Sequence, residues 1–227
     1  MQKPARFLFR FFAAFCLALG LGLAGSSFAV ELQEGKNFVT LPQPQPTEAK
    51  GKIEVTEFFW YGCPHCYEFE PTLNAWVKTL PDDVVFRRVP ADFGRWTGGV
   101  RLYYTLQALG VEERLHAELF NAIHRERLNF NSQAAVGDWL AKKGVDRKRF
   151  DDAYRSFTVQ ANISRAQQLT RSHGLDGVPA VIVGGKYLTN NVMAGGYEPL
   201  PAIMNALIAR LRAGGAQGTA ATAKSGK

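Results

Sequence analysis

Cysteine is scarce in this sequence, and its scarcity argues against a zinc site built from several cysteines. The 227-residue chain holds three cysteines, and one of them, Cys16, lies in an N-terminal segment ordered like a secretory signal peptide. Basic residues come first, an uncharged apolar run follows, and small residues come last, so we expect cleavage after Ala29; an uncleaved membrane anchor is the alternative. The mature chain would keep only Cys63 and Cys66, which leaves no second cysteine pair for a structural zinc site.

Other patterns are missing as well. No stretch of the sequence repeats at a fixed period, which argues against a repeat fold. The net charge is +7, yet no run of basic residues is interleaved with aromatic residues, so we expect a solvated basic surface and no nucleic-acid binding. Hydrophobic residues make up 46% of the chain and charged residues 21%, which is typical of a globular protein with a sizeable core.

The two remaining cysteines stand two residues apart in the motif Cys63-Pro64-His65-Cys66. A metal site needs further ligands, and the other histidines do not show close metal spacing, so we expect no metal. A static staple is a poor interpretation, because a disulfide that closes so short a loop removes little entropy from the unfolded chain. The spacing, the expected export to an oxidising compartment and the strand before the motif favour thiol–disulfide exchange.

The position of the motif predicts which sulfur reacts. An apolar strand precedes Cys63, and a helical pattern that begins with Pro64 follows it. Unpaired backbone N–H groups and the positive end of the helix dipole favour a thiolate at Cys63, and His65 can add a donor or a positive charge. A stabilised thiolate stabilises the reduced form, which makes the disulfide a stronger oxidant. Cys66, one turn inside the helix, should be more buried and less reactive.

The order of apolar patterns predicts an α/β chain. A short edge strand near residues 37–41 and a Pro-rich linker come first. Residues 52–60, "KIEVTEFFW", are apolar on both faces and predict a central strand. The helix that starts at Pro64 contains Pro71, which should kink or split it. A second strand, "DVVFRRVP", follows, and this order predicts a parallel pair with a right-handed crossover.

A helical block comes next. Four helical patterns and a longer helix at about residues 159–172 precede two short strands at residues 180–183 and 186–189. Gly184-Gly185 between these strands is typical of a hairpin turn. An amphipathic helix follows, and the Gly- and Ala-rich tail after Gly214 should be disordered. One sheet with helices on both faces is the simplest layout.

The motif and its surroundings resemble the DsbA family of periplasmic dithiol oxidases, which have a thioredoxin-like fold. The resemblance covers residues 34–212 and rests on "EFFWYG" before CPHC, "YEFEP" after it, the helical insertion, "GVPA" and a hairpin with "GGKY". Thioredoxin itself carries Gly-Pro between its cysteines, whereas Pro-His is typical of DsbA-like oxidases. The implied organisation is as follows: residues 1–29 signal peptide, 30–93 and 161–213 a discontinuous thioredoxin-like domain, 94–160 an inserted all-helical domain, and 214–227 a disordered tail.

The resemblance also implies roles for individual residues. Cys63 would be the sulfur that substrates attack, and Cys66 would be its partner. Val178-Pro179 matches the cis-proline loop of the family, where the backbone groups of Val178 face an extended substrate peptide. A proline that merely starts a strand is the alternative interpretation of Pro179.

Two acidic residues near the motif need an explanation. Glu57 lies in the apolar central strand, where a carboxylate is costly unless it is paired or protonated, and Arg87 or Arg88 on the adjacent strand could pair with it. The resemblance implies that Glu57 exchanges protons with Cys66; a plain buried ion pair is the alternative. Glu70 resembles a second such acid, or is a solvated helix position. No special role is expected for the remaining histidines, which are His116, His124 and His173.

As a whole, the resemblance implies a periplasmic protein dithiol:disulfide oxidoreductase. It would donate its Cys63–Cys66 disulfide to reduced, unfolded exported proteins, and it would need no cofactor. A DsbB-like membrane quinone reductase would restore the disulfide. The segment before the central strand is too short for a dimerisation domain, so we expect a monomer. The alternatives are a reductase or isomerase of the same fold and a non-catalytic chaperone that binds extended peptides.

Overall fold

The structure is a computed structural model that describes residues 30–224. The chain divides into two units, Met1–Val30 and Glu31–Lys227, and the fold belongs to the second. The expected signal peptide, residues 1–29, lies outside the described residues. Within the described part of the chain, no helix combines the length and the apolar character that crossing a lipid bilayer requires.

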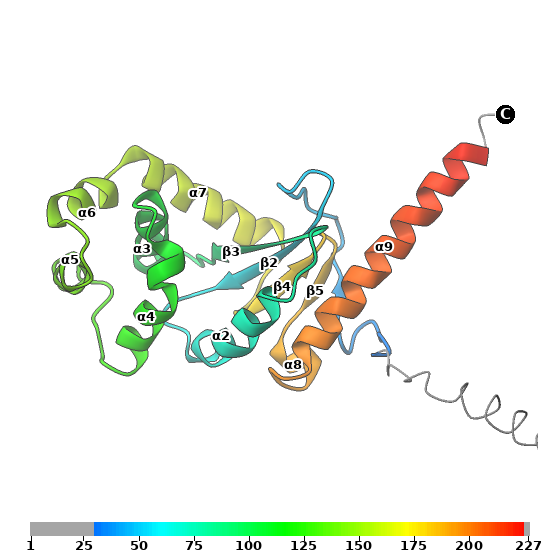
Figure 1. The fold of residues 1–227 in the computed structure, drawn as a ribbon, viewed down its shortest axis with the longest axis horizontal. Coiled ribbons are helices and arrows are strands. Elements are labelled where there is room, and N and C mark those ends of the chain that lie inside the picture. The colour runs from blue at the N-terminus through cyan, green and yellow to red at the C-terminus, as the bar shows by residue number, and fades with distance from the viewer. Residues whose placement is uncertain (1–29, 225–227) are drawn as a thin grey trace, which may run out of the picture. The chain divides into compact units, whose positions relative to one another are not determined.

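A mixed sheet of five strands forms the centre of residues 30–224 (Figure 1). The strands, in the order β1-β5-β4-β2-β3 across the sheet, are β1 Val39–Thr40, β5 Tyr187–Thr189, β4 Ala180–Val183, β2 Ile53–Phe59 and β3 Val84–Pro90. β2 pairs in parallel with β3 and antiparallel with β4, so it is the central strand that its apolar sequence predicts. β1 lies at the edge beside β5. The predicted edge strand, parallel pair and hairpin are confirmed.

Helix α2, Pro64–Val77, is the crossover between β2 and β3. Pro71 lies inside this helix, which runs unbroken, so of the two predicted effects, a kink or a split, the split does not occur. The buried face of α2 runs past Pro71 on both sides and comprises Cys66, Phe69, Glu70, Leu73 and Trp76. Packing of this face against the sheet stabilises the helix by more than the single backbone hydrogen bond that Pro71 cannot donate.

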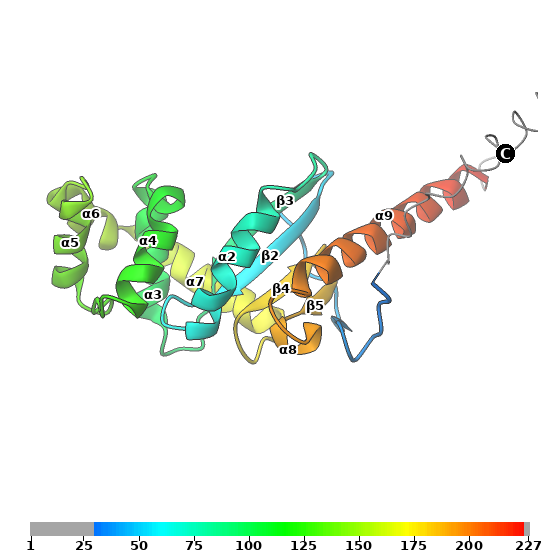
Figure 2. The ribbon, with the colours of Figure 1, turned by 60° about the horizontal axis from the view of Figure 1, so that its bottom comes forward.

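Five helices lie between β3 and β4, which confirms the predicted helical block. They are α3 Thr97–Ala108, α4 Glu112–His124, α5 Gln133–Lys142, α6 Arg147–Tyr154 and α7 Phe157–Ser172. Gly110 and Gly144 follow α3 and α5 with φ of +69° and +79°, a left-handed conformation in which glycine ends a helix at little cost. α7 runs back to the sheet (Figure 2), so the predicted boundary between residues 160 and 161 falls inside one continuous helix.

Helices cover both faces of the sheet. α2 and α9, Leu200–Lys224, lie side by side on one face, with the short α8, Asn191–Ala194, before α9 (Figures 1 and 2). The end of α7 packs against the other face, where the rings of His173 and Phe58 lie 4.9 Å apart. α9 continues to Lys224, past the point at which the composition predicts disorder. Alanine is frequent in this stretch and has the highest helix propensity of all residues.

Candidate active site

The CPHC motif lies where β2 gives way to α2. Cys63 is the last residue before the helix, with extended backbone angles, and Pro64 is the first helical residue. Both cysteines are free thiols. Cys63 is 8% exposed and Cys66 is fully buried. The prediction that Cys66 is the more buried sulfur is confirmed, and Cys63 is the sulfur that a thiol from outside can reach.

The two thiols ionise at very different pH. A hydrogen bond from the Cys66 thiol, followed by the backbone N–H groups of Cys66 and His65, lowers the pKa of Cys63 to about 6 against the opposing effect of burial. These N–H groups are unpaired donors of the first helical turn, which favour an anion. Burial raises the pKa of Cys66 well above its ordinary value, and Cys63 and Glu57 raise it further. At neutral pH Cys63 is therefore mostly a thiolate and Cys66 a thiol.

His65 contributes less than its place in the motif suggests. Its side chain is 62% exposed, and its Nδ1 atom lies 3.1 Å from the Tyr197 hydroxyl and 3.4 Å from a carboxyl oxygen of Glu68. Its charge does lower the pKa of Cys63, but Cys66 and the helix backbone have the larger effects. Sequence reasoning missed Tyr197, because this residue reaches His65 from a segment 132 positions away in the chain.

The Val178-Pro179 segment lies beside Cys63. The peptide bond between the two residues is cis, which confirms the prediction made from the family resemblance. The Sγ atom of Cys63 lies 3.5 Å from the Val178 carbonyl oxygen, to which the thiol donates when it is protonated. Because β4 begins directly after Pro179, the sheet holds this segment at the N-terminus of α2. The structure thus brings together the two parts of the site that the sequence predicts.

Glu57 is buried in the middle of β2, with an exposed fraction of 1%. Its register partner on β3 is Arg88, whose Nε atom lies 3.2 Å from a Glu57 carboxyl oxygen. Burial raises the pKa of Glu57 to about 8 in spite of this guanidinium, and the charge of Glu70 adds to the rise. The Glu57 carboxyl is therefore largely protonated at neutral pH. The other candidate from the sequence, Arg87, instead pairs with Glu48 at 2.7 Å.

Glu70 is buried as well, at 4% exposed, so its interpretation as a solvated helix position is wrong. One of its carboxyl oxygens accepts hydrogen bonds from Arg88 at 3.0 Å and from Asn74 at 2.9 Å, and lies 3.4 Å from Nε2 of His116. Burial opposes ionisation, but His116, followed by Arg88 and Asn74, holds the pKa of Glu70 below its ordinary value. Two buried carboxyls thus share one guanidinium, and Glu70 is the ionised one.

Sequence reasoning missed His116, which the structure places against this acid pair. The side chain of His116 is 3% exposed, and its Nδ1 atom lies 2.9 Å from the Tyr61 hydroxyl and 3.4 Å from a carboxyl oxygen of Glu112. The sequence did hold a signal. His116 precedes Leu119 and Phe120 by three and four residues, so it falls on the buried stripe of its helix, where a histidine needs polar partners.

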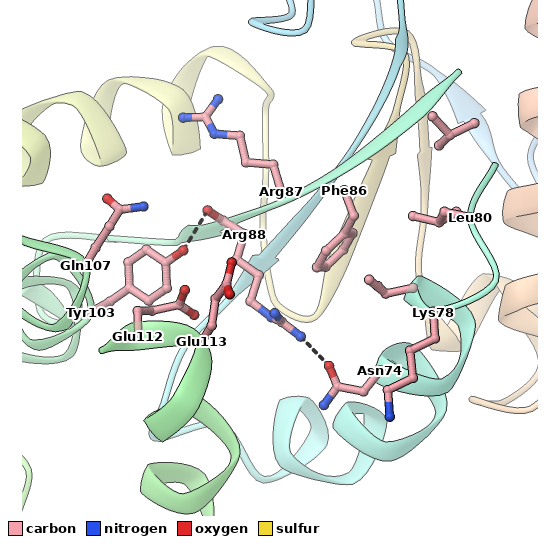
Figure 3. Close-up of a pocket in the computed structure, with 12 residues that line it drawn as sticks. Asn74, Lys78, Leu80, Phe86, Arg87, Arg88, Tyr103, Gln107, Glu112 and Glu113 are labelled. Atoms are coloured by element: carbon pink, nitrogen blue, oxygen red, sulfur yellow. Dashed lines mark hydrogen bonds between the residues drawn. The ribbon is translucent and has the colours of Figure 1, made fainter. Parts of the chain in front are cut away.

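A groove of about 810 Å³ opens beside this polar cluster (Figure 3). Residues of α2, β3, α3 and α4 line it, and Arg88 and Glu112 belong both to its wall and to the buried cluster. Arg88 donates to the Asn74 side-chain oxygen at 2.7 Å, and the Tyr103 hydroxyl donates to the Arg88 carbonyl at 3.3 Å. Neither cysteine lines the groove, so it is not the place where thiols exchange.

Comparisons with known proteins decide the family. The family model of the DSBA-like thioredoxin domain matches residues 85–207. The chain belongs to the DsbA-like thioredoxin domain family. A thiol:disulfide interchange protein DsbA of Burkholderia cepacia is 46% identical over 175 residues, which cover 76% of this chain and 82% of the relative. The DsbA of Azotobacter vinelandii is 41% identical over 208 residues, which cover 86% of this chain and 97% of the relative.

A solved DsbA structure supports the fold. The crystal structure of Pseudomonas aeruginosa DsbA matches with a TM-score of 0.78 and 41% identity, over 81% of this chain and 96% of that chain. The DsbA family model matches a segment that begins after the CPHC motif, so this match does not depend on the cysteine pair. The predicted DsbA-like family and thioredoxin-like α/β fold are therefore confirmed.

Proposed function

We propose that this DsbA-type oxidoreductase donates its Cys63–Cys66 disulfide to reduced, unfolded proteins exported to the periplasm. The enzyme acts on protein thiols and disulfides, as do the relatives named thiol:disulfide interchange protein. The observation that carries the direction of transfer is the lowering of the pKa of Cys63 to about 6 while the pKa of Cys66 is raised. Stabilising the Cys63 thiolate stabilises the dithiol, and this makes the disulfide a stronger oxidant.

The reaction begins when a substrate thiolate attacks the Sγ atom of Cys63, the more accessible sulfur of the pair. The Cys63–Cys66 bond breaks, a bond between the substrate and Cys63 forms, and Cys66 leaves with the electron pair. A thiolate at the fully buried Cys66 takes up a proton readily, because burial raises its pKa. Glu57 supplies that proton, since its own carboxyl is held protonated in the same core, and Arg88 then stabilises the carboxylate left behind.

The second half of the reaction releases the substrate. Its second thiolate attacks the substrate sulfur of the mixed disulfide, and Cys63 leaves as a thiolate. The low pKa of Cys63 makes it a good leaving group. The substrate leaves with a disulfide and the enzyme keeps two electrons as a dithiol. The Val178 carbonyl, 3.5 Å from Cys63, offers a backbone acceptor to an extended substrate segment during both steps.

The dithiol must then be oxidised again. A DsbB-like membrane quinone reductase fits this step, because it can take the two electrons through the same sulfur, Cys63, the more accessible of the pair. The enzyme would need no cofactor besides its own disulfide. It would work as a monomer in the periplasm, after its signal peptide has been removed.

The test is the redox equilibrium of the cysteine pair against glutathione buffers, read by alkylation of free thiols. We expect a reduction potential well above that of thioredoxin. A potential like that of thioredoxin would contradict disulfide donation and make the protein a reductase. A variant with both Cys63→Ala and Cys66→Ala tests the chaperone alternative: an oxidase loses its effect on substrate proteins, whereas a peptide-binding chaperone would still suppress their aggregation.

A further inference from the structure

His116 is a buried histidine for which the proposed redox reaction has no role. Its ring lies among aromatic side chains, with centroid distances of 5.1 Å to both Phe59 and Phe120. Each of its nitrogens nevertheless faces a carboxyl: Nε2 faces Glu70 and Nδ1 faces Glu112, both at 3.4 Å. Burying a histidine between two carboxyls in an apolar core costs free energy unless the contacts of the ring stabilise particular protonation states of those carboxyls.

The groups around His116 are short of positive charge. Those that titrate or carry charge are Glu57 of β2, Tyr61 of the β2–α2 loop, Glu70 of α2, Arg88 of β3, Tyr103 of α3 and Glu112 of α4. Three carboxyls meet one guanidinium, so burial leaves room for few ionised carboxylates. Burial also raises the pKa of Glu112. The contacts of the cluster must therefore select which carboxyl is ionised.

One tautomer of the His116 ring fits the contacts of both of its nitrogens. The Tyr61 hydroxyl lies 2.9 Å from Nδ1 and can donate to it, which leaves the ring proton on Nε2. Nε2 lies 3.4 Å from a carboxyl oxygen of Glu70, close enough for electrostatic attraction but longer than a regular hydrogen bond. A donor in this position stabilises the ionised form of Glu70 and offers nothing to Glu57.

We propose that His116 is a positioning residue that keeps the proton of the acid pair on Glu57 and off Glu70. An ionised Glu70 repels a second negative charge on Glu57, so Glu57 retains its proton. This is the proton that the Cys66 thiolate takes up when the disulfide opens, so the inference rests on the proposed function. His116 thus acts on the sulfur chemistry through two carboxyls and touches neither cysteine.

The experiment is a pH titration of the reduced protein by NMR, with ¹³C in the glutamate carboxyl groups. The Glu57 and Glu70 resonances are assigned with Glu57→Gln and Glu70→Gln. The test variant is His116→Gln. Its matched control is His173→Gln, because His173 is also buried and packs against the other face of β2, where its Nδ1 atom contacts the Leu169 carbonyl.

In the wild type we expect Glu57 to titrate at about pH 8. In His116→Gln we expect its midpoint to fall by about one pH unit and the midpoint of Glu70 to rise, because the proton moves between the two carboxyls. His173→Gln should leave both midpoints unchanged. A Glu57 midpoint that stays at the wild-type value in folded His116→Gln would overturn the proposal. A shift of the Glu57 midpoint by the same amount in His173→Gln would also overturn the proposal, because the effect would then not depend on the contacts of His116.

A second variant decides the matter if His116→Gln does not fold. Glu70→Gln keeps His116 and removes the charge through which it acts, so the Glu57 midpoint should fall; an unchanged midpoint again overturns the proposal. The pH profile of disulfide donation should move with the Glu57 midpoint in His116→Gln. The titration needs no oxidase activity. A thioredoxin-like reduction potential would therefore contradict the proposed function but leave the test of His116 valid.

Discussion

The Cys63 thiol and the Val178 carbonyl oxygen meet at 3.5 Å, although 115 positions separate the two residues in the chain. One belongs to the junction of β2 and α2, and the other to the segment that enters β4. Any partner that approaches the reactive sulfur therefore arrives beside a backbone acceptor. The reactive sulfur and the Val178 carbonyl lie in one site only because the helical block returns the chain to the sheet.

The two cysteines should differ sharply in their reaction with a small disulfide. We expect Cys66→Ala to form a mixed disulfide with glutathione rapidly through Cys63 and to retain it, because no second protein thiol can resolve it. Cys63→Ala should react far more slowly, since Cys66 is fully buried and its pKa is raised. Mass spectrometry at timed intervals gives both rates. Comparable rates for the two variants would contradict the assignment of Cys63 as the attacked sulfur.

The low pKa of Cys63 should make the stability of the dithiol form depend on pH. A folded-state pKa of about 6 lies below the ordinary value of 9.0, so the stabilisation is complete above pH 9 and is lost as the pH falls through 6. We expect the Tm of the reduced protein, relative to that of the oxidised protein, to rise between pH 5 and pH 9. The alkylation rate of Cys63 should reach half its maximum near pH 6. If the alkylation rate instead reached half its maximum near pH 9, the Cys63 thiolate would not be stabilised and the prediction would be wrong.

Arg88 and Arg87 form a matched pair of adjacent arginines on β3. Arg88 is the guanidinium that two buried carboxyls share, and removing one partner of a buried ion pair costs about 3–5 kcal/mol. Arg87 pairs with the half-exposed Glu48, a contact that contributes about 0–1 kcal/mol. Denaturant unfolding of Arg88→Gln and Arg87→Gln should therefore show a large and a small loss, respectively. Equal losses would mean that the carboxyls do not depend on Arg88.

Glu57→Gln should change how stability varies with pH. The pKa of Glu57 is raised from its ordinary value of 4.5 to about 8, so the folded protein holds a proton that the unfolded chain releases at lower pH. Folding stability from this group is thus present below pH 4.5 and is lost as the pH rises through 8. The Tm of the wild type relative to Glu57→Gln should fall from pH 5 to pH 8. Parallel curves across this range would show that Glu57 is already ionised when buried.

Local sequence patterns were enough to predict most of the fold and the difference in reactivity between the two cysteines. The apolar run that contains Glu57 predicted a central strand, and the position of Cys63 before Pro64 predicted which thiol is activated, because strand burial and helix N-termini are properties of neighbouring residues. The cis geometry before Pro179 came from the family resemblance.

The polar cluster could not be predicted in the same way. The choice between Arg87 and Arg88 depends on the register of β2 against β3, which a single strand does not reveal. The contact between His116 and Glu70 depends on how α4 packs against α2. The helical pattern can show that each side chain is buried, but it cannot show that they meet.

β2, the strand that leads to Cys63, pairs with one strand that is near in the sequence and with one that is distant in the sequence. β3 follows β2 after a single helix, whereas β4 begins at Ala180, after the whole helical block. A chain that emerges from its N-terminus first therefore presents the CPHC motif long before the strand that brings Val178 to it has been synthesised. Because long-range pairings form late, the half-made chain carries an incomplete centre. An enzyme with this topology has both sides of its redox site only after the chain has been made as far as β4.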